Sequence, residues 1–223
     1  MLKYGYKFRD SPMPIKYSCF ISYRSPSVEL AREFHSTLND HLSQYTTLPI
    51  YRDETRLRGG DFFNRELAIA LCESACMVMI YAPIYFDEFY TYCAREFKAM
   101  EILEAKRLRM LRGRKNDKHG LIIPVIYRGW KYFPSAISSI RHSYNFEFSL
   151  CGKSYLKRKE YNESIEKIAE YIFLRCNELK AMDKDPCGEC GTFELPAYDE
   201  IASWLPSMLP PKPIFPSRWG RKS

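Results

Sequence analysis

Short apolar runs and longer stretches with a helical period follow one another along this chain. The apolar runs are YSCFISY at 17–23, LPIYR at 48–52, CMVMIYA at 76–82 and GLIIPVIY at 120–127. Runs of this length and composition predict strands buried in a sheet. The alternating SYNFEFSL at 143–150 predicts a further strand nearer an edge of the sheet.

Helical patterns lie between these runs. Apolar residues recur every three or four positions over residues 27–44, over the stretch that follows Gly60, over 90–109 and over 158–181. Strands and helices therefore alternate, which predicts an α/β fold with a parallel sheet covered by helices on both faces. We expect a flavodoxin-like doubly wound five-stranded parallel sheet, in the strand order 2-1-3-4-5. Ligands of such sheets bind at the carboxyl ends of strands 1 and 3, where the strand order reverses.

The flanks of this pattern differ from its centre. We expect residues 1–16 to form an N-terminal extension, 17–181 to form the domain and 182–223 to form a Pro-rich C-terminal tail. The tail is expected to be non-globular or loosely packed, with one short helix near Ala197–Leu205.

Composition favours a soluble, cytoplasmic protein with no membrane partner. Hydrophobic residues make up 46% of the chain and charged residues 27%. No apolar run approaches the roughly 20 residues of a membrane span, and the N-terminus carries no apolar signal segment. Of the eight cysteines, five lie in apolar or helical segments, and we interpret them as reduced thiols: Cys19, Cys72, Cys76, Cys93 and Cys176.

The other chemistry-bearing patterns are weak. Cys187 and Cys190 form a Cys-x-x-Cys pair, but no second pair of ligands accompanies it, so we expect exposed thiols and no metal. The chain contains neither GxGxxG nor GxxxxGK[ST], the usual phosphate-binding loops. The formal net charge is +7, and positive residues gather in KRLRMLRGRKNDKH at 106–119. No aromatic residue interleaves with them, so we interpret a solvated helix end and do not expect nucleic acid as a partner.

The segment YTYCAREF at 90–97 contains a carboxylate in an unexpected position. Glu96 lies three residues after Cys93 and four before Met100, so it shares the apolar side of its helix. One interpretation is a structural carboxylate, favoured by the helix dipole or paired with a nearby cation. The other is a functional residue, because this helix begins at the crevice expected beyond strands 1 and 3.

Four segments, in order, resemble the TIR (Toll/interleukin-1 receptor) domain over residues 17–175. CFISYRS resembles its first-strand box, and IYRDETRLRGGDFFNRELAIAL resembles the second strand, the BB loop and the next helix. YTYCAREF resembles the aromatic-Cys-x-x-Glu element, with Tyr92 at the aromatic position, and IIPVIYRGW resembles the fourth strand. The resemblance implies a stand-alone TIR protein of the bacterial type that cleaves NAD+.

The same resemblance implies the roles of individual residues. Glu96 would be the catalytic residue, NAD+ would be the substrate, and neither a cofactor nor a metal would be needed. The nicotinamide of NAD+ is already a cationic leaving group, so one carboxylate that hydrogen-bonds the ribose and stabilises positive charge suffices. Substrate-binding positions are implied for Tyr23, Arg24, Asp53, Arg56, Leu57, Gly60, Phe62, Tyr92 and Trp130.

The family further implies self-association through TIR–TIR contacts, an upstream sensor or downstream effector, and a role in defence, for example against phage. Two alternatives stay open. One is a non-enzymatic TIR scaffold in signalling, and the other is a nucleoside- or nucleotide-processing enzyme on the same fold. Nicotinamide release distinguishes the first alternative from an NAD+-cleaving enzyme, and a screen of nucleosides distinguishes the second.

Overall fold

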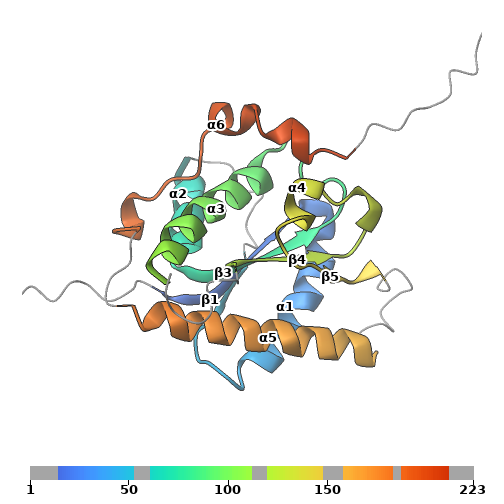
Figure 1. Cartoon of the computed structure of the whole chain (residues 1–223), viewed down its shortest axis with the longest axis vertical. Coiled ribbons are helices and arrows are strands. Elements are labelled where there is room, and N and C mark those ends of the chain that lie inside the picture. The colour runs from blue at the N-terminus through green and yellow to red at the C-terminus, as the bar shows by residue number, and fades with distance from the viewer. Residues whose placement is uncertain (1–14, 53–60, 112–119, 148–157, 183–186, 211–223) are drawn as a thin grey trace, which may run out of the picture.

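The structure is a computed structural model that describes residues 15–52, 61–111, 120–147, 158–182 and 187–210 (Figure 1). Its five parallel strands have the order β2-β1-β3-β4-β5, which confirms the flavodoxin-like α/β arrangement expected from the sequence. The strand bounds are β1 Tyr17–Tyr23, β2 Ile50–Arg52, β3 Ser74–Tyr81, β4 Ile122–Ile126 and β5 Tyr144–Asn145.

Helices cover both faces of the sheet, as Figure 1 shows. One face carries α1 and α5, and the other carries α2 and α3. The short α6 lies outside α3. The helices are α1 Val28–Leu42, α2 Asp61–Cys72, α3 Tyr92–Leu111, α4 Ser135–Ser138, α5 Lys159–Lys180 and α6 Tyr198–Ala202, with short 3-10 turns η1 Ser25–Ser27, η2 Trp130–Tyr132, η5 Cys190–Thr192 and η6 Leu205–Met208.

The centre of the sheet is the most deeply buried part of the molecule. All eight residues of β3 are buried, as expected for a strand that is covered on both faces. Tyr23 of β1 lies in register with Ile80 of β3, which in turn is in register with Val125 of β4. The carboxyl ends of the three central strands therefore lie side by side. Helix α2 follows β2, which is parallel to β1, and α3 follows β3, so both helices start at this edge.

The edge strand is shorter than expected. We predicted a strand over 143–150, but within the described residues the strand spans only Tyr144–Asn145. Its neighbour β4 ends at Ile126, whose carbonyl accepts a last hydrogen bond from the Phe146 amide (2.7 Å). After Ile126, β4 has no further residues with which the chain beyond Phe146 could pair.

The C-terminal segment is packed, which contradicts the expectation of a loose tail for residues 187–210. Ile201, Leu205 and Met208 are at most 3% exposed, and α6, which carries Ile201, packs on α3. The predicted short helix near 197–205 is confirmed as α6.

Two cysteine predictions are also wrong. Cys72, expected to be a reduced thiol, is disulfide-bonded to Cys190, expected to be exposed in the tail. The bond joins positions 118 residues apart, a proximity that the sequence pattern does not show. The other buried cysteines are reduced, as predicted, and burial raises the pKa values of Cys19, Cys76 and Cys176, the last to about 12.

The basic run at the end of α3 is only partly solvated. Arg107 is fully buried, and its guanidinium donates to the carbonyls of Ser74 (2.8 Å) and Cys72 (2.5 Å). It thereby joins α3 to the connection between α2 and β3. The interpretation of this position as part of a solvated helix end is therefore wrong.

Among the described helices, none has the length and apolar character needed to cross a bilayer.

Candidate active site

Glu96 lies at the predicted edge of the sheet, inside the protein. It occupies the second turn of α3 and has no exposed surface. The Ser22 hydroxyl, at the carboxyl end of β1, donates a hydrogen bond of 2.5 Å to Glu96 Oε2. The helical period and the strand order had predicted both features, the burial of this carboxylate and its position beside strand 1.

A third residue extends this contact into a chain of hydroxyls. The hydroxyl of Tyr85, which follows β3, lies 2.6 Å from Ser22 Oγ, and both side chains are buried. Ser22 has a single hydroxyl hydrogen and gives it to Glu96, so Tyr85 is the donor to Ser22. The polar chain Tyr85–Ser22–Glu96 thus directs two O–H dipoles toward one carboxylate.

Neither Ser22 nor Tyr85 was among the predicted site residues. A signal for Ser22 existed in the strand YSCFISY, whose alternation places Ser18, Phe20 and Ser22 on one face of the sheet. A small hydroxyl at the carboxyl end of a fully buried strand face needs a polar partner. No comparable signal marked Tyr85, which comes to Ser22 from 63 positions away.

Three predicted residues lie at the end of β1 and at the start of α3. Tyr23 is 2% exposed, and its carbonyl accepts a hydrogen bond from the thiol of Cys93 (3.4 Å). The Arg24 guanidinium lies 4.3 Å from the ring centre of Tyr90, which joins the loop after β1 to the loop before α3. Tyr92, the first residue of α3, is 43% exposed.

The remaining predicted positions fall into two groups. Asp53, Arg56, Leu57 and Gly60 lie outside the described residues, and so does the side chain of Phe62. Trp130 lies in η2 beyond β4, where it is 44% exposed and its amide donates to Glu147 (2.9 Å).

A cavity of about 590 Å³ opens beside the start of α3. Arg95, which precedes Glu96, lines it together with Arg65 and Asn64 of α2. The opposite wall is formed by residues 191–195 of the C-terminal segment. Two guanidinium groups at this edge suit an anionic ligand such as a pyrophosphate. Neither arginine was a predicted site residue, because the C-terminal segment was not expected to lie here.

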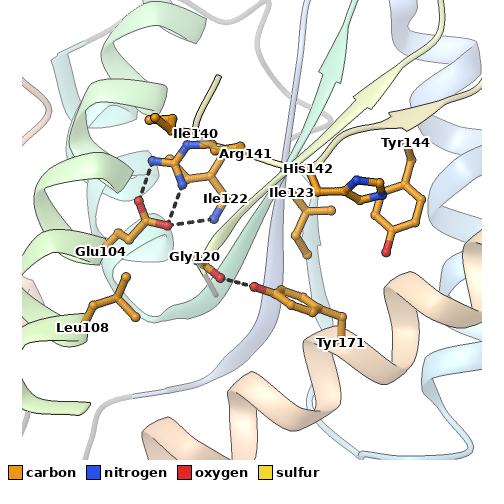
Figure 2. A pocket seen from close by; sticks show the side chains of 10 residues that line it. All are labelled: Glu104, Leu108, Gly120, Ile122, Ile123, Ile140, Arg141, His142, Tyr144 and Tyr171. Atoms are coloured by element: carbon orange, nitrogen blue, oxygen red, sulfur yellow. Dashed lines mark hydrogen bonds and ion pairs between the residues drawn. The ribbon is translucent and has the colours of Figure 1, made fainter. Parts of the chain in front are cut away.

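A second cavity, of about 530 Å³, lies at the opposite, amino-terminal edge of the sheet (Figure 2). Figure 2 shows Glu104 of α3 facing Arg141, with two hydrogen bonds of 2.8 and 2.5 Å between them. On the other side, the Tyr171 hydroxyl donates to the carbonyl of Gly120 (2.5 Å). Burial raises the pKa of Tyr171, which keeps that hydroxyl protonated.

The described residues contain no group of three or more His, Cys, Asp or Glu side chains that could hold a metal ion. No family model matches the chain, and no curated protein matches it.

Proposed function

We propose that this protein is a TIR-like enzyme that cleaves NAD+ at the bond between nicotinamide and ribose. One observation carries the proposal. A buried glutamate from the Tyr-Cys-x-x-Glu element lies at the carboxyl end of β1, the edge where flavodoxin-like sheets bind ligands. The ordered TIR-like segments of residues 17–175 support the same activity.

The proposed chemistry needs one carboxylate. As the C–N bond breaks, its electron pair leaves with nicotinamide, which becomes neutral, and positive charge develops on the ribose. Glu96 accepts hydrogen bonds from the ribose hydroxyls and stabilises that charge at short range in a desolvated site. Water then adds to the ribose carbon and loses a proton, which gives linear ADP-ribose. Attack by a nitrogen of the adenine instead gives a cyclic product.

Neighbouring side chains suit the rest of the substrate. Aromatic rings of Tyr92 and Tyr90 border the edge and can stack on a base, and Arg24 already packs against one of them. Arg65 and Arg95 line the adjacent cavity and suit the pyrophosphate. Asp53, Arg56, Leu57, Gly60 and Phe62 keep their proposed roles in the BB loop and the following helix, and Trp130 keeps its role beyond β4.

Substrate access requires a local change, because Glu96 has no exposed surface. In our proposal a ribose hydroxyl takes the place of the Ser22 hydroxyl on the carboxylate. Self-association through TIR–TIR contacts would complete the site, which makes turnover depend on protein concentration. We further propose a cytoplasmic protein that acts in defence with a sensor or an effector.

The burial of Glu96 specifically favours a second candidate, the non-enzymatic TIR scaffold. A carboxylate that is 0% exposed and hydrogen-bonded by Ser22 is also what a structural role requires. In that case the protein would signal by self-association and would leave NAD+ intact.

Nicotinamide release from NAD+ by the full chain, measured at increasing protein concentration, tests the enzyme against the scaffold. The Glu96→Gln variant keeps the shape of the side chain and should lower release at least about 100-fold. Glu101→Gln, the same change on the partly exposed side of α3, is the matched control and should retain turnover. Wild-type protein that is assembled yet releases no nicotinamide would refute the enzyme, and equal release by Glu96→Gln would refute the site.

A further inference from the structure

A disulfide joins the C-terminal segment to α2, and a third cysteine lies close to it in the sequence. Cys72, the last residue of α2, is bonded to Cys190, the first residue of η5. Cys187, three positions before Cys190, is reduced and partly exposed. Cys-x-x-Cys is the spacing at which thiol–disulfide exchange proteins hold their two sulfur atoms together. The cluster therefore contains a disulfide and a third thiol in exchange spacing with one of its halves.

The three sulfur atoms differ in their access to solvent. Cys72 is 0% and Cys190 4% exposed, so a dissolved thiol reaches their bond poorly. Cys187 is more open, and its turn has room to move. Gly188 adopts φ +73°, and an added Cβ at Gly188 or Gly191 would meet no atom within 4 Å. Among the described reduced cysteines, Cys187 is therefore the most exposed and the nearest in sequence to Cys190.

The disulfide fastens a segment that we call the strap, residues 187–210. The strap crosses the start of α3, where Arg95 Nε donates to the Pro196 carbonyl (2.6 Å). The ring of Trp204 stacks on Phe97 with centroids 5.9 Å apart. These two contacts flank Glu96 in the sequence, so the strap holds the turn of α3 that carries the candidate catalytic residue.

We propose that Cys72, Cys187 and Cys190 form a thiol–disulfide exchange site that fastens and releases the strap. The Cys187 thiolate attacks Cys190 Sγ, a Cys187–Cys190 bond forms, and the Cys72–Cys190 bond breaks. Cys72 leaves as a thiolate and takes up the proton that Cys187 lost. One disulfide replaces another, so the step needs no outside oxidant or reductant.

Release changes the candidate site, and this consequence rests on the proposed function. Residues 191–195 form one wall of the cavity that Arg65 and Arg95 line. When Cys190 is no longer tied to α2, that wall loses its covalent anchor. The exchange thus controls access to the edge of the sheet at which Glu96 lies.

Peptide mapping tests the exchange directly on the full chain. Protein oxidised with glutathione disulfide is incubated near pH 8.5, where thiols ionise, then quenched in acid, alkylated and digested. Wild type should convert part of its Cys72–Cys190 peptide into a Cys187–Cys190 peptide. Proteolysis within the strap should become at least about tenfold faster in the converted fraction.

Two serine variants make the result specific. Cys187→Ser should keep the Cys72–Cys190 bond and the slow proteolysis until an external dithiol is added. Cys176→Ser, a reduced cysteine of α5 whose thiol donates to the Ser18 carbonyl (3.7 Å), should behave as wild type. Strap release in Cys187→Ser at the wild-type rate would overturn the proposal.

Eight alkylated thiols in the oxidised protein would overturn it as well. These experiments measure the pairing of the cysteines and the cleavage of the backbone. They therefore test the exchange even if the protein releases no nicotinamide. Nicotinamide release from the two disulfide forms, measured afterwards, tests only the link between the strap and the site.

Discussion

Two glutamates of α3 are buried at opposite edges of the sheet, and their surroundings differ. Glu104, at the amino-terminal edge, accepts hydrogen bonds from the guanidinium of Arg141 and from the backbone amides of Leu121 and Ile122. Glu96, about 12 Å away along the helix, accepts a hydrogen bond from the neutral hydroxyl of Ser22. A cation and two amides contact the first carboxylate, and among the described residues a neutral hydroxyl donates to the second.

The comparison shows that burial alone does not assign a role to a carboxylate. Glu104 is 7% exposed and Glu96 is 0% exposed, so both are buried carboxylates. Within the part of the chain that the structure describes, the donors that contact them differ. A buried ion pair with further amide donors is typical of a structural element, because removal of either partner leaves an uncompensated charge.

The largest effect on stability is expected at Glu104. Its replacement by Gln removes the nearer of two carboxylates from Arg141, whose side chain is 10% exposed, and leaves Glu101 at 3.8 Å. We expect the free energy of unfolding to fall by about 3–5 kcal/mol. Denaturant unfolding measures this change. Glu101→Gln removes a partly exposed pair with Lys98 and a longer contact of 3.8 Å with Arg141, and it should stay within about 1 kcal/mol of wild type. An equal loss in both variants would contradict the comparison.

The site around Glu96 should respond more weakly. Ser22→Ala removes a buried hydroxyl that donates to Glu96 and accepts from the Tyr85 hydroxyl. The cost of a buried polar group that loses its partner is about 1–3 kcal/mol. Thermal or denaturant unfolding tests this value. A loss as large as that of Glu104→Gln would mean that Glu96, too, is chiefly structural.

The strand order and the register of the central strands explain why the sequence located Glu96. Apolar runs near residues 17–23, 76–82 and 120–127 are long and almost uninterrupted, so they identify β1, β3 and β4 without ambiguity. Once these strands are parallel, the start of α3 must lie at their carboxyl edge. The position of Glu96 then follows from the helical period alone.

The partners of both glutamates come from far along the chain, and the sequence pattern does not indicate which residues they are. Arg141 is 37 positions from Glu104 and looks like any charged residue near a short helix. The strap was missed for a related reason. Its prolines predict irregular backbone, but irregular backbone can still bury Ile201 and Leu205, and nothing in the spacing of the cysteines indicates the bond of Cys190 to Cys72.

The smallest effect concerns a third glutamate, on the surface between α1 and α5. Two hydrogen bonds lower the pKa of Glu166 below its ordinary value. The bond from the Tyr45 hydroxyl has the larger effect, and the bond with His41 has the next largest. A lowered folded-state pKa adds stability above the unfolded pKa, near 4.5, and this stability is lost as the pH falls through the folded value. Unfolding midpoints at about pH 7 and about pH 3 should therefore differ less in Glu166→Gln than in wild type.

Glu163→Gln, on the same helix, is the control for this pH dependence. Its pair with Lys159 is exposed, so its unfolding midpoints should follow wild type at both pH values. A wild-type pH dependence in Glu166→Gln would show that the contacts with His41 and Tyr45 do not contribute to stability.

The central claim is that one buried glutamate of α3 acts on substrate and the other holds the fold. Nicotinamide release and the free energy of unfolding, measured together on Glu96→Gln and Glu104→Gln, test it most directly. The account predicts that Glu96→Gln loses at least about 100-fold in release while its stability falls by no more than about 1 kcal/mol. Glu104→Gln should lose stability and, at temperatures where it is folded, keep its turnover. Stability loss without loss of turnover in Glu96→Gln would contradict the account.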